Sequence, residues 1–298
     1  MNTKEISKED AMMLESLYWW DIPTLFRCPI ERDPEKSDIA LVGVPHSTGN
    51  GTTERDQHLG PRALRNVSAM ARRVHMGFQI DPWKTCRIND MGDVPLPEAN
   101  DNERCIERIT DFYRAIDRSL TRPVSVGGDH SVTGGIIQAI AGEHASLTGG
   151  RKAAFLHFDA HTDAYEKVPH FLGAIKSAAH WASFLVRQGQ IDAHSSVQIG
   201  MRGNPRTLDW LAPSTELGYE VITMERYRSL GMSETIKIIL DRIGDVPLYI
   251  TFDLDCMDPT VAPGVANIEA GVQGFQIDEV LELLRCVRGR NIIGGDVV

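Results

Sequence analysis

Short apolar runs alternate along the chain with longer stretches in which apolar residues recur at helical spacing. The short runs predict strands at residues 39–44, 123–126, 153–158, 196–199, 220–222, 248–252 and 291–297. The longer stretches predict helices at residues 61–73, 102–120, 132–141, 233–243 and 278–287. Because strands and helices alternate, we expect an α/β fold, a three-layer αβα sandwich in which helices cover both faces of a mostly parallel sheet.

The same pattern indicates how the chain is divided. No internal repeat, low-complexity tract or linker-like segment interrupts it, so we expect a single domain over residues 1–298, with residues 1–37 as an N-terminal extension. Residues 294–298 lie inside a run typical of a buried strand, with no helix after it. We therefore expect a truncated C-terminus, with at least one more helix in the natural protein.

Charge and composition narrow the classes of partner. The formal net charge is −10 and no run of lysine and arginine could bind a phosphate backbone, so we expect no nucleic acid but a small cationic substrate. The chain has neither the roughly 18 consecutive apolar residues of a membrane span nor a signal peptide, so we expect no membrane contact. The five scattered cysteines, without a CxxC pair, indicate reduced thiols and a cytoplasmic protein.

Histidine and aspartate residues directly follow three of the predicted strands. They are His130 after the strand at 123–126, then Asp159, His161 and Asp163 after 153–158, and Asp253 and Asp255 after 248–252. In open α/β sheets, ligands bind beyond the carboxyl ends of the strands, and alternate residues of an extended segment share a face. We therefore expect these six side chains to converge in one crevice.

Four neighbouring carboxylates would repel one another and resist ionisation unless cations balanced them. Each motif taken singly fits aspartates that cap turns and histidines that pack in the core, but the three together favour a binuclear metal centre. Oxygen-rich sites with two imidazoles suit Mn²⁺ and tolerate Ni²⁺, Co²⁺ or Fe²⁺, and the lack of thiolates disfavours a structural zinc site.

Three segments carry a resemblance to a known family. Residues 127–131 read GGDHS, residues 159–163 read DAHTD and residues 253–264 read DLDCMDPTVAPG. With these three motifs, the sequence resembles the ureohydrolase superfamily of arginases, agmatinases and guanidinobutyrases. The resemblance extends from about Ile39 to the last residue. The resemblance implies an arginase-like fold and a metal-dependent hydrolase that cleaves a C–N bond of a guanidino compound, releasing urea or a urea derivative and an amine. It also implies homo- or hetero-oligomers, trimers or hexamers.

The resemblance further implies a division of the ligands between two divalent ions, Ni²⁺ or Mn²⁺. One ion is expected at His130, Asp159, Asp163 and Asp253, and the other at Asp159, His161, Asp253 and Asp255, so that Asp159 and Asp253 bridge them. A hydroxide shared by the ions is expected to attack the guanidinium carbon. Asp163 is expected to pass the proton to the departing amine.

Two further catalytic residues come from the resemblance. Glu269 aligns with the glutamate that holds the guanidinium in the family, a role that suits a carboxylate. His180, in the segment HWASF, is the best match to the proton-shuttling histidine, and His170 is its rival. His157 is expected to support a ligand or to pack in the core, and Asp129 to hold its loop.

The resemblance also bears on the substrate. Ala164 and Tyr165 follow DAHTD, which is closer to agmatinases than to arginases, and residues 48–65 look closest to guanidine hydrolases and metformin hydrolases. Trp181, which replaces a glycine of the family, suggests a reshaped pocket. We expect a small guanidine or biguanide, with agmatine or guanidinobutyrate as the second candidate. Alternatives from other classes are a subunit that needs a partner chain for activity, and hydrolysis of another C–N bond such as a formimino group.

Overall fold

Parallel strands form the centre of the molecule in the computed structural model, which describes residues 7–50, 56–71, 74–166, 175–205, 207–269 and 271–298. Its eight-stranded sheet has the order β2-β1-β3-β8-β7-β4-β5-β6, and every neighbouring pair is parallel. The strands are β1 (Ile39–Gly43), β2 (Ile88–Asp93), β3 (Arg122–Val126), β4 (Ala154–Phe158), β5 (Val197–Met201), β6 (Glu220–Thr223), β7 (Leu248–Phe252) and β8 (Ile292–Val297).

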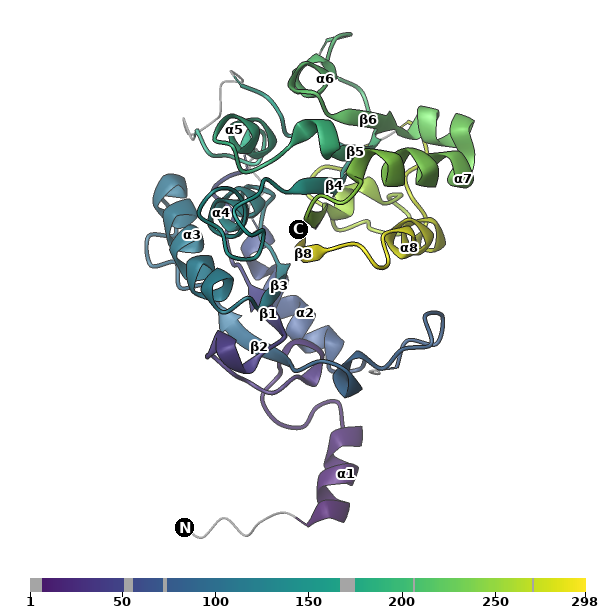
Figure 1. Cartoon of the computed structure of the whole chain (residues 1–298). Coiled ribbons are helices and arrows are strands. Elements are labelled where there is room, and N and C mark those ends of the chain that lie inside the picture. The colour runs from purple at the N-terminus through teal and green to yellow at the C-terminus, as the bar shows by residue number, and fades with distance from the viewer. Residues whose placement is uncertain (1–6, 51–55, 72–73, 167–174, 206, 270) are drawn as a thin grey trace.

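Helices cover both faces of this sheet, as Figure 1 shows. The helices of the described residues are α1 (Lys8–Ser16), α2 (Gly60–Ser68), α3 (Asn102–Arg118), α4 (Ser131–Ile140), α5 (Trp181–Arg187), α6 (Ala212–Leu217), α7 (Met224–Ile243) and α8 (Ile277–Cys286). α3, α4 and α5 pack on one face, and α7 and α8 pack on the other. The expected three-layer α/β sandwich is thereby confirmed, and the sheet is entirely parallel.

The alternation of side chains along β4 shows how the two layers of core arise. Phe155 points into the core beneath α3, α4 and α5, whereas Leu156 and Phe158 point into the core beneath α7 and α8. All three are fully buried, as expected for a strand covered on both faces. His157 lies on the same face as Phe155, so the residues that continue this face at the strand's end are directed toward α4 and α5.

Several elements differ from the sequence prediction. β2 was not predicted, because it lies at the edge of the sheet and includes Asn89, Asp90 and Asp93, which are unusual in a strand. α7 begins at Met224 rather than at residue 233, because it joins two helical stretches across a kink at Gly231, where φ is 75°, and only the second stretch was predicted. The short helices α5 and α6 were also missed.

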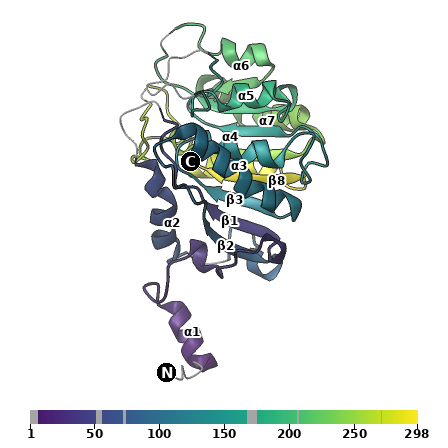
Figure 2. The same ribbon diagram turned by 90° about the vertical axis from the view of Figure 1, so that its left-hand side faces the viewer.

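The N-terminal segment extends away from the sheet, with α1 projecting below the body of the molecule (Figure 2). After it, Trp19 and Trp20 are 66% and 48% exposed, so these rings do not anchor the core. Among the described helices, none combines the length and the hydropathy required to cross a membrane.

Candidate metal centre

Loops at the carboxyl ends of three strands carry the predicted site residues to one place. His130 follows β3 and is the residue directly before α4. Asp159 follows β4, and Asp253 follows β7 as the N-cap of a short 3₁₀ turn. Because β4 and β7 are paired neighbours, their two aspartates leave the sheet side by side. The site therefore lies where parallel sheets usually bind their ligands.

His130 is surrounded by carboxylates at one ring nitrogen. Its Nδ1 lies 2.9 Å from Asp159 Oδ2, 3.1 Å from Asp163 Oδ2 and 3.3 Å from Asp253 Oδ2. The ring is buried, yet within the described part of the chain this nitrogen has no partner that satisfies the angular requirement of a hydrogen bond. An imidazole nitrogen directed between three carboxylate oxygens without an aligned hydrogen bond is suited to a cation.

His161 has a matching environment on the other side of Asp159. Its Nδ1 lies 3.0 Å from Asp255 Oδ2 and 3.4 Å from Asp159 Oδ1. Asp159 therefore directs one oxygen toward each histidine, which is the geometry expected of a carboxylate that bridges two cations. Asp159 and Asp255 are both buried.

The backbone holds these carboxylates in position. The amide of Asp255 donates to Asp253 Oδ1 at 2.8 Å, and the amide of Ala160 donates to Asp255 Oδ1 at 3.0 Å. Asp253 therefore presents Oδ2 to His130 while its other oxygen is bonded within its own turn. Asp159 thus contacts both His130 and His161, whereas the side chain of Asp253 contacts the ring of His130.

Proton affinities in the cluster are shifted in opposite directions. Burial would lower the pKa of His130, but its three carboxylate contacts outweigh this effect and hold that pKa well above its usual value. Burial would raise the pKa of Asp159, but the close contacts of its carboxylate with the rings of His130, His157 and His161 lower it well below the usual range. A proton held on an imidazole by surrounding carboxylates occupies the place that a metal ion would take.

Asp253 and Asp255 have raised pKa values because several carboxylates are buried close together. Burial, together with repulsion from neighbouring carboxylates, raises the pKa of Asp253 and raises that of Asp255 well above its usual value. Divalent cations would remove this repulsion and favour the ionised carboxylates. The donor set of oxygens and two imidazoles thus fits a pair of divalent ions.

His157 lies close enough to Asp159 to be considered as a ligand, but its hydrogen bonds indicate another role. Gln198 Nε2 donates to His157 Nδ1 at 3.0 Å, and His157 Nε2 lies 2.8 Å from Asp159 Oδ2. With Nδ1 accepting, the ring proton is on Nε2 and is donated to Asp159. His157 therefore supports the carboxylate from behind.

Asp129 holds the loop before α4. Its Oδ2 accepts the backbone N–H groups of Gly49 and Asn50 at 2.8 and 3.0 Å, and its Oδ1 accepts that of Ser131 at 3.0 Å. The carboxylate is buried and is directed into the backbone of two loops. This fastens the segment at residues 49–50 to the loop that carries His130.

Glu269 contacts the cluster through a histidine. Its Oε1 lies 2.9 Å from His161 Nε2, which leaves His161 Nδ1 directed toward Asp159 and Asp255. This hydrogen bond has the largest effect on the pKa of Glu269 and lowers it, whereas burial acts in the opposite direction and would raise it. Gly203, with φ 97°, makes room for the carboxylate, because a Cβ there would lie 2.0 Å from Glu269 Oε2.

Asp163 is held by a tryptophan that the sequence suggested as a pocket wall. The indole Nε1 of Trp181 donates to Asp163 Oδ2 at 2.9 Å, and the ring is fully buried, with its centre 4.7 Å from that of His130. Trp181 therefore packs behind the cluster and does not shape an entrance. Asp163 itself has φ 48°, a conformation that is uncommon and costly outside glycine and is often found at functional sites.

The candidate shuttle residue His180 occupies the N-cap position of α5. Its Nδ1 is hydrogen-bonded to Ser177 Oγ at 2.5 Å. The amide of Ala182 in the same helix donates to the carbonyl of Asp163 at 3.1 Å, so α5 begins beside the cluster. His170, the rival, lies outside the described residues.

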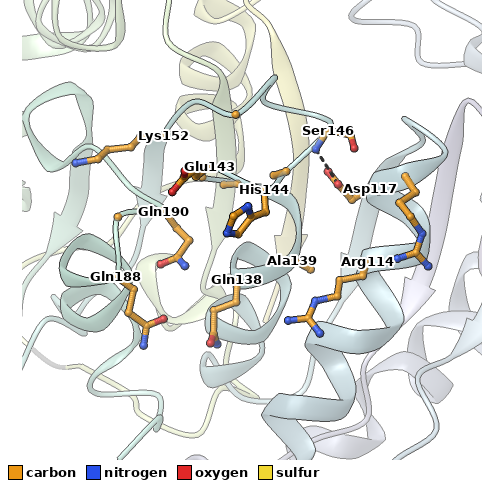
Figure 3. Close-up of a pocket in the computed structure, with 16 residues that line it drawn as sticks. Arg114, Asp117, Gln138, Ala139, Glu143, His144, Ser146, Lys152, Gln188 and Gln190 are labelled. Atoms are coloured by element: carbon orange, nitrogen blue, oxygen red, sulfur yellow. Dashed lines mark hydrogen bonds between the residues drawn. The ribbon is translucent and has the colours of Figure 1, made fainter.

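A separate hollow of about 620 Å³ lies at the opposite end of β4 (Figure 3). Its lining includes Arg114, Gln138, His144 and Gln190, and the amide of Ser146 in this lining donates to Asp117 of α3. None of the six predicted ligands lines it. The carboxylate–histidine cluster is therefore distinct from this hollow.

The chain is similar to proteins of known activity over most of its length. Residues 37–298 match the model of the Arginase family. The chain is 36% identical to guanidinopropionase of Pseudomonas aeruginosa over 279 residues, which is 93% of this chain and 83% of that protein. It is 30% identical to guanidinobutyrase of the same organism, over 93% of this chain and 84% of that protein. Among solved structures, proclavaminate amidinohydrolase of Streptomyces clavuligerus superposes with a TM-score of 0.82 at 28% identity, covering 95% of this chain and 89% of that one.

Proposed function

The chain belongs to the arginase family, and from this premise we propose that it hydrolyses a C–N bond of a guanidino compound at the carboxylate–histidine cluster. The observation that carries the proposal is the position of Asp159, which directs one oxygen toward His130 and the other toward His161. Two divalent ions, held by the six predicted ligands, would supply Lewis-acid activation of water when bound.

The chain's own residues have separate tasks in this proposal. Asp163 lies at the edge of the cluster, where its carboxylate can take a proton and transfer it to the departing amine. Trp181 keeps that carboxylate oriented through its indole N–H. His180 is the candidate for carrying protons between the cluster and solvent.

Glu269 is proposed to attract and orient the guanidinium. A carboxylate beside a planar cation forms strong charge-assisted hydrogen bonds, and the lowered pKa of Glu269 keeps it ionised. Its bond to His161 gives it a second task, because it leaves His161 Nδ1 available to a metal ion. Glu269→Gln is therefore expected to weaken both substrate binding and the metal on the His161 side.

For the substrate, we favour a small guanidine or biguanide such as guanidine or metformin. The support is the resemblance of residues 48–65 to hydrolases of these compounds, and the attachment of Gly49 and Asn50 to the loop of His130 through Asp129. The second candidate is a guanidino compound with a longer chain, such as agmatine or guanidinobutyrate. The names guanidinopropionase and guanidinobutyrase among the relatives favour this second candidate.

The deciding experiment is reconstitution of the metal-stripped full chain with Mn²⁺ or Ni²⁺, followed by assays of urea, ammonia and amine release. The substrates are guanidine, metformin, agmatine, guanidinobutyrate, guanidinopropionate and arginine. Release from one of the first two favours the small-guanidine assignment, and release only from the others refutes it. No release from any of them with either metal would contradict hydrolysis by the isolated chain and favour a subunit that needs a partner.

We also propose that the chain functions as a trimer or hexamer. The segment around α1 exposes Met12, Met13, Trp19 and Trp20, and several large apolar side chains exposed along one segment are typical of protein contacts. The molar mass in solution, measured by light scattering for the wild type and for a Trp19→Ala, Trp20→Ala double variant, tests this. A wild-type mass equal to that of one chain would refute it.

A further inference from the structure

A row of buried polar side chains crosses the sheet one level below the candidate metal centre. The paired positions are Ser125 in β3, Asp296 in β8, Thr251 in β7, His157 in β4 and Gln198 in β5, each in register with the next. All five are at most 3% exposed. Interior positions of a parallel sheet are usually apolar, so a continuous polar row requires an explanation.

The row is placed by the alternation of the strands. His157 and Thr251 precede Asp159 and Asp253 by two residues, and therefore lie on the same face of the sheet one step deeper. On one side, His157 donates to Asp159, as described above. On the other side, Thr251 Oγ1 lies 2.8 Å from His130 Nε2, the nitrogen that faces away from the carboxylates.

Asp296 fixes the direction of these hydrogen bonds. It accepts hydroxyl protons from Thr251 at 2.7 Å, from Thr133 at 2.9 Å and from Tyr249 at 2.8 Å. A threonine hydroxyl has one proton. Because Thr251 gives its proton to Asp296, its oxygen can only accept from His130 Nε2.

We propose that Thr251 and Asp296 are positioning residues that hold His130 as the tautomer protonated at Nε2, so that the lone pair of Nδ1 faces the metal position. The inference rests on the proposed function, because it assumes that a metal ion binds beside His130. Partners that fix the tautomer and orientation of a ligating histidine commonly change metal affinity by a factor of about 10–100.

The test is metal affinity, measured by competition between the metal-stripped full chain and a chromophoric chelator for Mn²⁺ and Ni²⁺. Thr251→Val keeps the shape of the side chain and removes its hydroxyl, and is expected to weaken binding of one of the two ions by about 10–100-fold. Thr251→Ser restores the hydroxyl and is expected to restore the affinity to within about threefold of the wild type, a rescue that a purely steric role would not produce.

Tyr249→Phe is the matched control. It removes another of the three hydroxyls that Asp296 accepts but leaves the path through Thr251 to His130 intact, and is expected to bind metal within about threefold of the wild type. Asp296→Asn is the second variant. Its amide can donate to Thr251 and turn that hydroxyl toward His130, which favours the wrong tautomer, so its affinity should fall at least as far as that of Thr251→Val.

The outcomes separate this inference from the proposed function. A wild-type chain that binds neither Mn²⁺ nor Ni²⁺ contradicts the metal centre and with it the proposed function. A wild-type chain that binds metal, while Thr251→Val binds it equally well, contradicts only the role of Thr251 and Asp296. An equal loss in Thr251→Val and Tyr249→Phe also overturns it, because the loss would then reflect a disturbed core.

Discussion

Replacing Gly203 by alanine should damage the His161 side of the site through a contact that the structure defines. The added Cβ would lie 2.0 Å from Glu269 Oε2 and 2.7 Å from its Cδ, so the carboxylate must move. Since Glu269 Oε1 is bonded to His161 Nε2 at 2.9 Å, this movement breaks the bond that orients the imidazole.

The expected loss has two parts. A non-glycine residue at φ 97° costs about 1–3 kcal/mol of folding free energy. Loss of a hydrogen bond to a charged group adds roughly 1.5–3 kcal/mol, at the lower end here because the Glu269 side chain is 26% exposed. Gly203→Ala should therefore lower the free energy of unfolding by about 2.5–5 kcal/mol in total.

Gly271→Ala is the matched control. Gly271 has φ 111°, but a Cβ there would meet no atom within 4 Å, so this variant carries the backbone strain without the clash. Urea unfolding of the metal-stripped chains should show Gly271→Ala about 1–3 kcal/mol below the wild type and Gly203→Ala lower by a further 1.5–2 kcal/mol or so. Metal content after dialysis should fall only in Gly203→Ala. Equal stability and equal metal content in the two variants would refute the reasoning.

Three more predictions follow from single contacts. Asp159→Ala should leave the purified chain without either metal ion, whereas Asp255→Ala should retain about one ion per chain by elemental analysis, because only Asp159 faces both histidines. Trp181→Phe keeps the ring but removes the indole N–H, and should lower kcat with little change in KM, whereas an altered KM alone would indicate a pocket wall. Burial would raise the pKa of Asp90, but Arg65 and two backbone amides lower it, so this pair stabilises the fold above about pH 4 and loses that contribution as the pH falls through the lowered pKa. Asp90→Asn should accordingly reduce the unfolding free energy by about 3–5 kcal/mol at pH 7 and by less at pH 3, as denaturant titrations at both pH values would show.

The central strands could be predicted from sequence because burial on both faces leaves a largely apolar run, as in residues 153–158. Gly127 and Gly128 likewise marked the loop of His130, and a Cβ at Gly128 would lie 2.0 Å from the carbonyl of His46. β2 could not be predicted in this way. An edge strand is paired on one side only and tolerates Asn89 and Asp90, so its hydrophobic signal is weak.

The six candidate ligands could be predicted from their motifs because each motif is local, so its spacing alone places its side chains. Other contacts that support these residues are not local. Trp181 reaches Asp163 from a helix 18 residues later, and Glu269 reaches His161 from 108 residues away. These contacts depend on how α5 and the loop before α8 pack, which no pattern of apolar and polar positions specifies.

The sequence did contain one unused signal for the polar row. His157, Thr251 and Asp296 each interrupt a run that otherwise indicates a strand buried on both faces. A buried polar group is costly unless it is hydrogen-bonded, so three such interruptions on adjacent strands imply partners among themselves. In a parallel sheet with this register they become neighbours, and two residues further along β4 and β7 the same face carries Asp159 and Asp253. The candidate metal centre and the residues that would support it are thus successive levels of one sheet face, and a register shift of one residue in β7 would turn both Thr251 and Asp253 toward the opposite core.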